Sequence, residues 1–151
     1  MIQRLSHATL YVLDQDAAKD FYVNKLGFEL RMDETMGASS DKSIPGGFRW
    51  LTVSPKGQPD LQIILMKVDG PNMQPEVSAA IRGLLARGKL NGGVLQTSDC
   101  RKTYDELTAK GVEFLSPPKE QFYGIEAVMK DNSGNWFSLS SALPAAKETK
   151  A

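Results

Sequence analysis

The sequence contains very few residues of the kinds that form covalent cross-links or bind metals. Among its 151 residues there is a single cysteine, Cys100, and a single histidine, His7. One cysteine excludes an internal disulfide and is typical of a reducing compartment, so we expect a cytoplasmic protein. Cys100 opens a predicted helix, where it is either a packing residue or an activated thiolate. The function depends on whether His7 is a metal ligand.

The chain also lacks net charge and long apolar stretches. Eighteen basic residues balance eighteen acidic ones, so neither nucleic acid nor a membrane is an expected partner. No apolar run approaches the ~20 residues of a membrane helix. Residues 1–14 have no apolar core or cleavage signature, so we expect no signal peptide. The composition, 41% hydrophobic and 24% charged, is ordinary for one globular domain with a sizeable core.

One arrangement of strand, helix and glycine occurs twice in the sequence. Residues 5–13 alternate between apolar and polar side chains, which predicts a strand. Either Asp14 or Asp16 can cap the helix that follows, and Gly27 ends that helix. Residues 94–111 repeat this order, with another aspartate as the cap and another glycine as the stop.

Three further strands are expected after each helix. In the first half, β-forming runs cover residues 28–32, 48–54 and 61–68. In the second half, similar runs cover residues 112–115, 125–130 and 136–140. Residues 33–47 are polar and glycine-rich, which predicts a loop, and Ser116-Pro117-Pro118 predicts a break in the second half.

Each half therefore has the order β-α-β-β-β, and the fold class is α+β. Within a single domain of residues 1–151, module one covers about residues 2–68 and a helical connector covers 69–91. Module two covers 92–141, and a flexible tail covers 142–151. Two such modules with curved sheets can form a half-barrel around a cavity, which is where we expect the site.

The chain resembles the vicinal oxygen chelate superfamily, which includes glyoxalase I, extradiol dioxygenases, and fosfomycin and bleomycin resistance proteins. The resemblance rests on His7 ahead of LYVLD, FYVNKLGFEL, SDCRKTYDELTAKGVEF and YGIEAVMKDNSGNWFSLSS. It covers about residues 2–141. It implies a fold more strongly than a reaction, because one fold supports many functions.

In the metal-using members of this superfamily, a divalent ion is held by residues of the first and last strands of each module. The resemblance places these ligands at His7 and Gln62 in module one, and at Gly92 (or Gly93) and Ser138 in module two. Imidazole and amide oxygen can bind a divalent cation, but glycine offers no side chain and the set carries no carboxylate. We therefore expect no cofactor, with a divalent metal on His7 and Gln62 as the alternative.

Without a metal, the candidate site is a pocket of aromatic and neutral polar side chains, which suits an organic ligand that stacks and forms hydrogen bonds. The alternative for Trp50 and Trp136 is a place in the core or in a dimer interface, and for Arg49 it is a surface ion pair. The expected ligand-binding residues are His7, Tyr11, Arg49, Trp50, Gln62, Gln96, Tyr123, Trp136 and Ser138.

The function implied by the resemblance is binding of a small organic molecule without a metal, as in bleomycin-resistance-type proteins, by a homodimer. One alternative is a glyoxalase-like lyase or isomerase, or a dioxygenase, with a divalent ion on His7. Glu126, Glu113 or Asp60 would then have to supply negative charge. Another alternative is a regulatory protein with a vestigial pocket. His7 is also the best single candidate for a catalytic acid or base.

Overall fold

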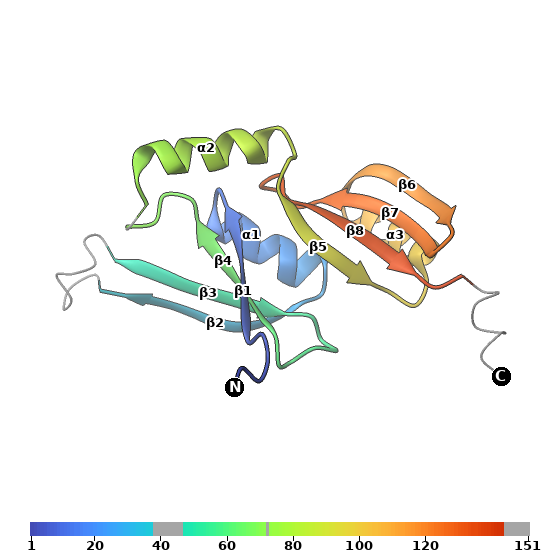
Figure 1. The fold of residues 1–151 in the computed structure, drawn as a ribbon, viewed down its shortest axis with the longest axis horizontal. Coiled ribbons are helices and arrows are strands. Elements are labelled where there is room, and N and C mark those ends of the chain that lie inside the picture. Colours follow the sequence, from blue (N-terminus) through green and yellow to red (C-terminus); the bar gives the residue numbers. More distant parts are fainter. Residues whose placement is uncertain (38–46, 72, 144–151) are drawn as a thin grey trace.

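The computed structural model describes residues 1–37, 47–71 and 73–143, which form two four-stranded sheets (Figure 1). Each sheet belongs to one half of the chain, and the two sheets have the same strand order. In each half, a helix connects the first strand to the second. The predicted α+β architecture of two tandem βαβββ modules is therefore confirmed. Residues 144–151, most of the expected tail, lie outside the described residues.

Sheet A is built from the first half of the chain. It contains β1 (His7–Val12), β2 (Glu29–Met36), β3 (Phe48–Ser54) and β4 (Gln62–Lys67), in the order β1-β4-β3-β2. The β1 strand runs parallel to β4, and the other neighbours are antiparallel. Helix α1 (Gln15–Asp20) follows β1 and continues as a π-helical turn, η1 (Phe21–Lys25).

Sheet B repeats this arrangement. It contains β5 (Asn91–Gln96), β6 (Glu113–Gln121), β7 (Gly124–Lys130) and β8 (Trp136–Ser141), in the order β5-β8-β7-β6. Helix α3 (Cys100–Ala109) connects β5 to β6, and α2 (Pro75–Ala86) connects the modules along the top of the view in Figure 1. Among the described residues, none of these helices has the length and apolar character required to cross a membrane.

The helices after β1 and β5 begin at aspartates that the sequence offers as caps. The Asp14 carboxylate accepts the Ala17 N–H at 2.9 Å, and the Asp99 carboxylate accepts the Lys102 N–H at 3.1 Å. Asp14, rather than Asp16, is therefore the cap of α1. Because these carboxylates satisfy amides that the first helical turn leaves unpaired, they fix where each helix starts.

The β2 strand is longer than the sequence predicts. The polar segment that begins at Asp33 is predicted as a loop, but residues 33–36 pair with β3. The Asp33 carboxylate lies 2.9 Å from Lys19 Nζ and 2.8 Å from Arg49 Nε. The loop prediction was wrong for residues 33–36. Aspartate has a low intrinsic preference for strands, but these ion pairs and the pairing with β3 stabilise Asp33 in a strand. Of the rest of that predicted loop, residues 38–46 lie outside the described residues.

The β6 strand also continues past a predicted break, through Ser116, Pro117 and Pro118. Its register with β7 shifts at Ser116 and again before Lys119. Because β6 is the outer strand of sheet B, a proline there removes no hydrogen bond from the inside of the sheet. The predicted break was wrong because an edge strand tolerates the missing amides.

Each sheet has one face covered by its own helix. The strand residues on these two faces are buried in one shared core that includes Leu10, Val12, Leu51, Leu65, Ala127, Met129, Phe137 and Leu139. The helix residues packed on them include Phe21, Tyr22 and Leu107. A single core therefore joins the two modules through their helix-bearing faces.

The strand residues that alternate with the core residues form the opposite face of each sheet, since successive side chains of a strand point to opposite sides. The open face of sheet A includes His7, Thr9, Tyr11, Met32, Glu34, Met36, Phe48, Trp50, Thr52, Ser54, Gln62, Ile64 and Met66. The open face of sheet B includes Val94, Gln96, Glu113, Ser116, Lys119, Glu126, Val128, Lys130, Trp136, Ser138 and Ser140.

The turn between β7 and β8, Asp131–Asn135, is held by one buried carboxylate. Asp131 is 3% exposed, and its Oδ1 accepts the backbone N–H groups of Ser133, Gly134 and Asn135, each at 2.9 Å. Its Oδ2 accepts the Asn135 side-chain amide at 2.9 Å and the Tyr22 hydroxyl at 2.6 Å. These bonds offset the large cost of burying a charged group.

The same turn joins module two to module one. Tyr22 belongs to η1, Ser133 Oγ accepts the Leu13 N–H at 3.0 Å, and the Asn135 side chain donates to the Tyr11 carbonyl at 2.8 Å. Burial, together with the adjacent carboxylate, raises the pKa of Tyr22 well above its usual value. The Tyr22 hydroxyl therefore stays protonated and acts as a donor across the junction.

Removing the Tyr22 hydroxyl should weaken this junction. We expect Tyr22→Phe to lower the free energy of unfolding by about 1–3 kcal/mol, because Asp131 stays buried with one donor fewer. Urea denaturation followed by circular dichroism measures the change. The control is Tyr104→Phe, since the half-buried Tyr104 has no hydroxyl partner among the described residues, and its cost should stay below about 0.5 kcal/mol. Equal costs for the two variants would contradict a special role of the Tyr22 bond.

Candidate functional site

His7 and Gln62 lie directly opposite each other on adjacent strands of the open face of sheet A. The His7 side chain is exposed, and its Nδ1 lies 3.0 Å from the Ser6 hydroxyl. Gln62 Oε1 accepts the Thr52 hydroxyl at 2.8 Å. The structure thus brings two of the predicted site residues together, and the amide oxygen of Gln62 already has a partner.

Aromatic side chains continue across this face from His7. The Trp50 ring centroid lies 6.2 Å from that of His7, with the ring planes tilted by 51°. The Phe48 centroid lies 6.1 Å from that of Trp50, with a tilt of 45°. We call His7, Trp50 and Phe48 the aromatic row. Phe48 is absent from the predicted set, although its alternation with Trp50 along β3 is a signal that could have identified it.

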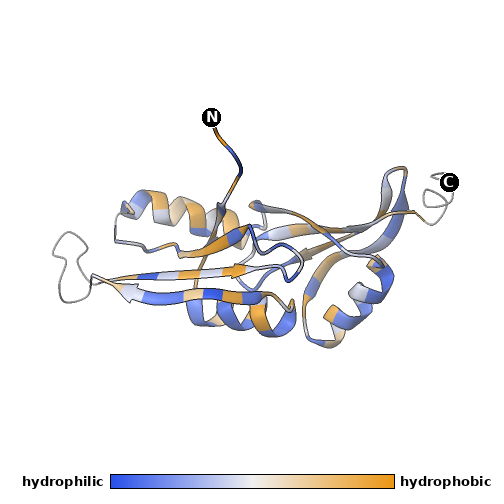
Figure 2. Ribbon diagram, turned by 90° about the horizontal axis from the view of Figure 1, so that it is seen from below, coloured by the Kyte–Doolittle hydropathy of each residue, from blue (hydrophilic) through white to orange (hydrophobic). Residues whose placement is uncertain are grey.

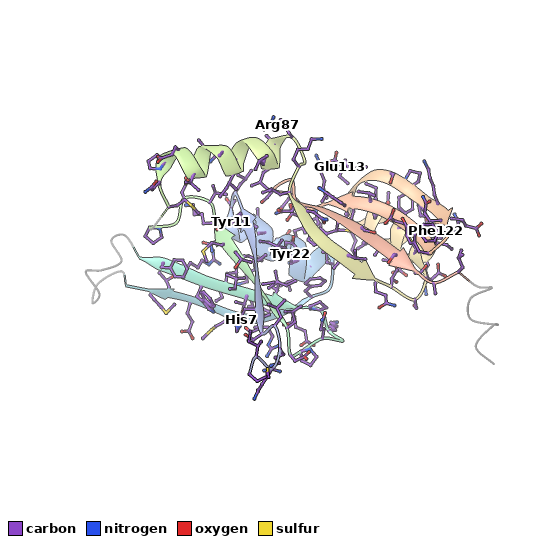
Figure 3. The ribbon with its side chains drawn as sticks, viewed as in Figure 1. His7, Tyr11, Tyr22, Arg87, Glu113 and Phe122 are labelled. Carbon is purple, nitrogen blue, oxygen red and sulfur yellow. The ribbon has the colours of Figure 1, made fainter. Side chains whose placement is uncertain are left out.

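Near Tyr11 the open face of sheet A is hollowed into a pocket of about 270 Å³. Tyr11, Phe48 and Met66 line it from three strands, Met73 joins them from the segment before α2, and Lys67 at the end of β4 is the charged residue of the lining. Figure 3 shows His7 and Tyr11 at opposite ends of β1, so the aromatic row and the pocket extend along the same face. The two methionines are flexible and can adapt to the shape of a ligand.

Arg49 lies on the helix-bearing face of sheet A, because it alternates with Trp50 along β3. Its guanidinium pairs with Asp33 at 2.8 Å and with Asp16 at 2.6 Å. The hydrogen bond from Arg49 lowers the pKa of Asp33 well below its usual range, and the same pairing raises the pKa of Arg49. The structure therefore shows the ion pair that the sequence offers as the alternative, and it does not bring Arg49 to the open face.

In module two, Val94 rather than Gly92 lies opposite Ser138, because the pairing of β5 with β8 is irregular around Gly92. A Cβ atom at Gly92 would overlap the ring of Phe137. This ring is only 2% exposed and is fixed in the core. The packing therefore requires glycine at the position where the resemblance places a metal-binding histidine.

Ser138 is linked to Glu126, a carboxylate that the sequence offers only as a spare source of charge. The Ser138 hydroxyl donates to Glu126 Oε2 at 2.6 Å, and the Tyr123 hydroxyl donates to Oε1 at 2.8 Å. The hydrogen bond to this carboxylate raises the pKa of Tyr123. Glu126 therefore links Ser138 and Tyr123. Alternation along β7 is the sequence signal that could have placed Glu126 on the open face.

The other candidates of module two lie away from His7. Gln96 is exposed on β5 and lines a hollow of about 560 Å³ together with residues of the β3–β4 turn. Trp136 is half-buried at the start of β8. Tyr123 lies in the β6–β7 turn against Phe122, which Figure 3 shows far from His7. Within one chain, the predicted residues are therefore divided between the two modules, and Arg49 lies on neither open face.

Cys100 is a buried packing residue at the start of α3. Its Sγ donates to the Leu139 carbonyl at 3.4 Å, and its N–H donates to the Ser141 hydroxyl at 3.1 Å. Burial raises the pKa of the thiol. An activated cysteine needs a lowered pKa and access to solvent, so the packing interpretation holds.

The two βαβββ modules and their open faces define a class of proteins. Residues 4–139 match the family model of the Glyoxalase/Bleomycin resistance protein/Dioxygenase superfamily, and the chain belongs to this superfamily. The resemblance inferred from the sequence is thereby confirmed over nearly the whole described chain.

Several individual proteins are similar along their whole length. UcmS2 is 46% identical, with a TM-score of 0.84 and coverage of 94% of this chain and 100% of UcmS2. TnmS3, an antibiotic binding protein from Streptomyces sp. CB03234, is 31% identical, with a TM-score of 0.68 and coverage of 94% and 98%. A protein of Shewanella frigidimarina is 34% identical over 139 residues, which are 92% of this chain and 93% of that protein.

The close packing at Gly92 gives a testable consequence. We expect Gly92→Ala to destabilise the fold by about 1–3 kcal/mol, because the added methyl group displaces the Phe137 ring within a packed core. Chemical denaturation measures this. The control is Gly83→Ala in α2, where a Cβ would meet nothing within 4 Å, and this change should be neutral or stabilising by up to about 1 kcal/mol. Wild-type stability of Gly92→Ala would show that the ring moves aside freely.

Proposed function

We propose that this protein is a metal-independent small-molecule binding protein that sequesters an organic antibiotic or metabolite on the open face of sheet A. The observation that carries the proposal is the aromatic row lying beside the apolar pocket on one face. Aromatic contacts contribute about 0.5–1.5 kcal/mol each beyond the area they bury. A flat apolar body packed on Trp50 and Phe48 would gain affinity without any bond being broken.

The size and polarity of the pocket suit such a ligand. Its volume of about 270 Å³ is near the lower end of the roughly 300–1,000 Å³ of small-molecule sites, and the aromatic row extends it toward His7. Gln62 and the His7 ring supply polar groups at the far end of the face. Burial of rings with a few oriented polar contacts is the usual composition of an organic-ligand site.

The side chains at the ligand positions of the superfamily do not fit a divalent ion. Gln62 already accepts a hydroxyl, Gly92 has no side chain, and Ser138 donates its hydroxyl to Glu126. Divalent ions such as Mn²⁺ need anionic ligands to offset the loss of water. In the described part of the chain, no group of three or more histidine, cysteine, aspartate or glutamate side chains is arranged to hold a metal.

Similarity to TnmS3 supports the same function from another side. That protein is an antibiotic binding protein, and the 31% identity to it extends over 94% of this chain and 98% of TnmS3. Because one fold supports many functions, this similarity supports the aromatic site and does not replace it. The competing functions are a metal-dependent glyoxalase or dioxygenase and a regulatory protein with a vestigial pocket, and ligand-binding and metal measurements distinguish them from sequestration.

The protein would act as a homodimer in which a second copy covers the open face of sheet A. This face and its edge expose large apolar side chains, including Met32 and Met36 at 42% and 44%. Figure 2 shows the N-terminal segment extending away from the body, and this segment carries the exposed Ile2 and Leu5. Apolar surface of this kind favours association. A partner would also close a ligand site that is open in one chain.

Ligand binding can be tested by thermal unfolding with a panel of aromatic antibiotics and metabolites. We expect at least one compound to raise the unfolding midpoint by roughly 5–10 °C at a 100-fold excess over its Kd. Trp50→Ala should abolish the shift because it removes the centre of the aromatic row, and EDTA should leave it unchanged. Phe122→Ala is the control, since this ring is 95% exposed at the far end of the molecule.

Two results would overturn the proposed function. If no compound of the panel shifts the midpoint, the vestigial-pocket alternative is favoured. If protein purified without chelator contains a stoichiometric metal that disappears in His7→Ala, the metal-dependent enzyme is favoured.

The homodimer can be tested by sedimentation velocity. We expect the wild type to sediment as two chains of 16.6 kDa each. Met32→Lys should shift the protein toward the monomer, because it places a charge on the surface that would be buried. Val77→Lys is the matched control on α2, since Val77 and Met32 are exposed to similar extents, 41% and 42%. A monomeric wild type, or equal effects of the two substitutions, would contradict the proposed interface.

A further inference from the structure

The end of β4 borders three hollows that adjoin one another. The pocket of about 270 Å³ on the open face of sheet A and a second hollow of about 190 Å³ have five lining residues in common: Phe48, Met66, Lys67, Gly70 and Pro71. A third hollow of about 200 Å³, beside the start of α1, shares three lining residues with the second: Gln15, Arg49 and Lys67. Lys67 is therefore the residue common to all three hollows.

Lys67 brings a positive charge to the rim of the apolar pocket. It alternates with Met66 along β4 and so starts from the helix-bearing side of sheet A. However, it is the last residue of β4, and it lines the pocket of the open face as well. An ammonium on a flexible four-carbon stem can reach either side of a strand end. The rest of the pocket lining is apolar apart from the hydroxyl of Tyr11.

The ammonium of Lys67 has no ion-pair partner within the described residues. The carboxylates close to it are bonded elsewhere: Asp14 to the Ala17 N–H, Asp16 to Arg49, and Asp69 to Arg82. Asp14 and Asp16 line the third hollow and neither of the other two. The charge of Lys67 is thus not balanced at the pocket, where apolar surroundings strengthen its attraction for an anion.

An acidic residue on the same open face determines which end of a ligand would carry an anion. Glu34 lies opposite Trp50, the central ring of the aromatic row. Since like charges repel, an anionic group is disfavoured beside Trp50 and favoured at the Lys67 end of the pocket. Phe48 belongs to both the row and the pocket, so one aromatic ligand can contact both.

We propose that Lys67 is the binding group for a carboxylate of the ligand. The inference rests on the proposed function and gives the ligand a chemical class, an aromatic acid. Its ring would pack on Phe48 and Met66, and its carboxylate would meet the Lys67 ammonium at the rim of the pocket. An ammonium has three donors and no acceptor, whereas a carboxylate only accepts, so the two groups are complementary in hydrogen bonding as well as in charge.

Three naphthalene probes that differ in one substituent test this inference by isothermal titration calorimetry at neutral pH and low salt. They are 2-naphthoate, which is an anion, its uncharged methyl ester, and 2-naphthylmethylamine, which is a cation. We expect the wild type to bind the anion roughly 5- to 20-fold more tightly than the ester. This range lies between an exposed ion pair and a hydrogen bond to a charged group. The cation should bind most weakly.

Lys67→Met should abolish the preference for the anion, because it removes the charge and keeps an unbranched side chain. Affinity for the ester should stay the same, which also shows that the variant is folded. Lys67→Arg should retain most of the preference. Lys119→Met is the control with the same loss of charge, because Lys119 lies exposed on β6 of the other sheet and lines none of the three hollows. It should behave as the wild type does.

The outcomes separate this inference from the function on which it rests. Equal affinity of the wild type for anion and ester, or a preference that survives Lys67→Met, would overturn the role of Lys67 while binding of aromatic molecules still stands. If none of the three probes binds to the wild type, neither the aromatic site nor the carboxylate site holds.

Discussion

The arrangement of the two modules depends on the buried carboxylate of Asp131. It folds the β7–β8 turn by accepting three consecutive amides, and it accepts the Tyr22 hydroxyl from the other module. The same turn also forms hydrogen bonds with the Tyr11 carbonyl and the Leu13 N–H, at the end of β1. Because these contacts unite the helix-bearing faces in one core, both open faces are left free for ligand or partner. The local geometry of one turn thus determines which surfaces of the protein can have a function.

The two modules share a topology but offer different chemistry on their open faces. Sheet A presents rings and methionines around His7 and Gln62, with Glu34 opposite Trp50, whereas sheet B presents serines, Gln96, Glu126 and two lysines, Lys119 and Lys130. On the helix-bearing faces the two sheets are alike, because both contribute aliphatic and aromatic side chains to one core. Packing therefore constrains one face of each module and leaves the other face available for recognition. The open face of sheet A suits apolar surface, and the open face of sheet B suits polar groups.

Much of the fold follows from local signals in the sequence. The capping aspartates and the strand of residues 48–54 could be predicted because they depend on neighbouring residues. The extension of β6 through Pro117 and Pro118 could not, since it depends on β6 being an edge strand. The candidate site was predicted less completely. Ser138 pairs with Val94 because of an irregularity in β5, and the Ser138 hydroxyl bonds to Glu126 on a neighbouring strand. Both features depend on how strands pair, which a local sequence pattern does not specify.

The two prolines of β6 have a consequence for how the protein meets other chains. A strand that joins an existing sheet needs a continuous row of amides and carbonyls along its edge. Pro117 and Pro118 leave two consecutive residues of this edge strand without a backbone donor, and the register shifts around them interrupt the regular ladder. This border is therefore protected against uncontrolled growth into β-aggregates. Association through added strands is directed instead to the edges formed by β1, β2 and β5.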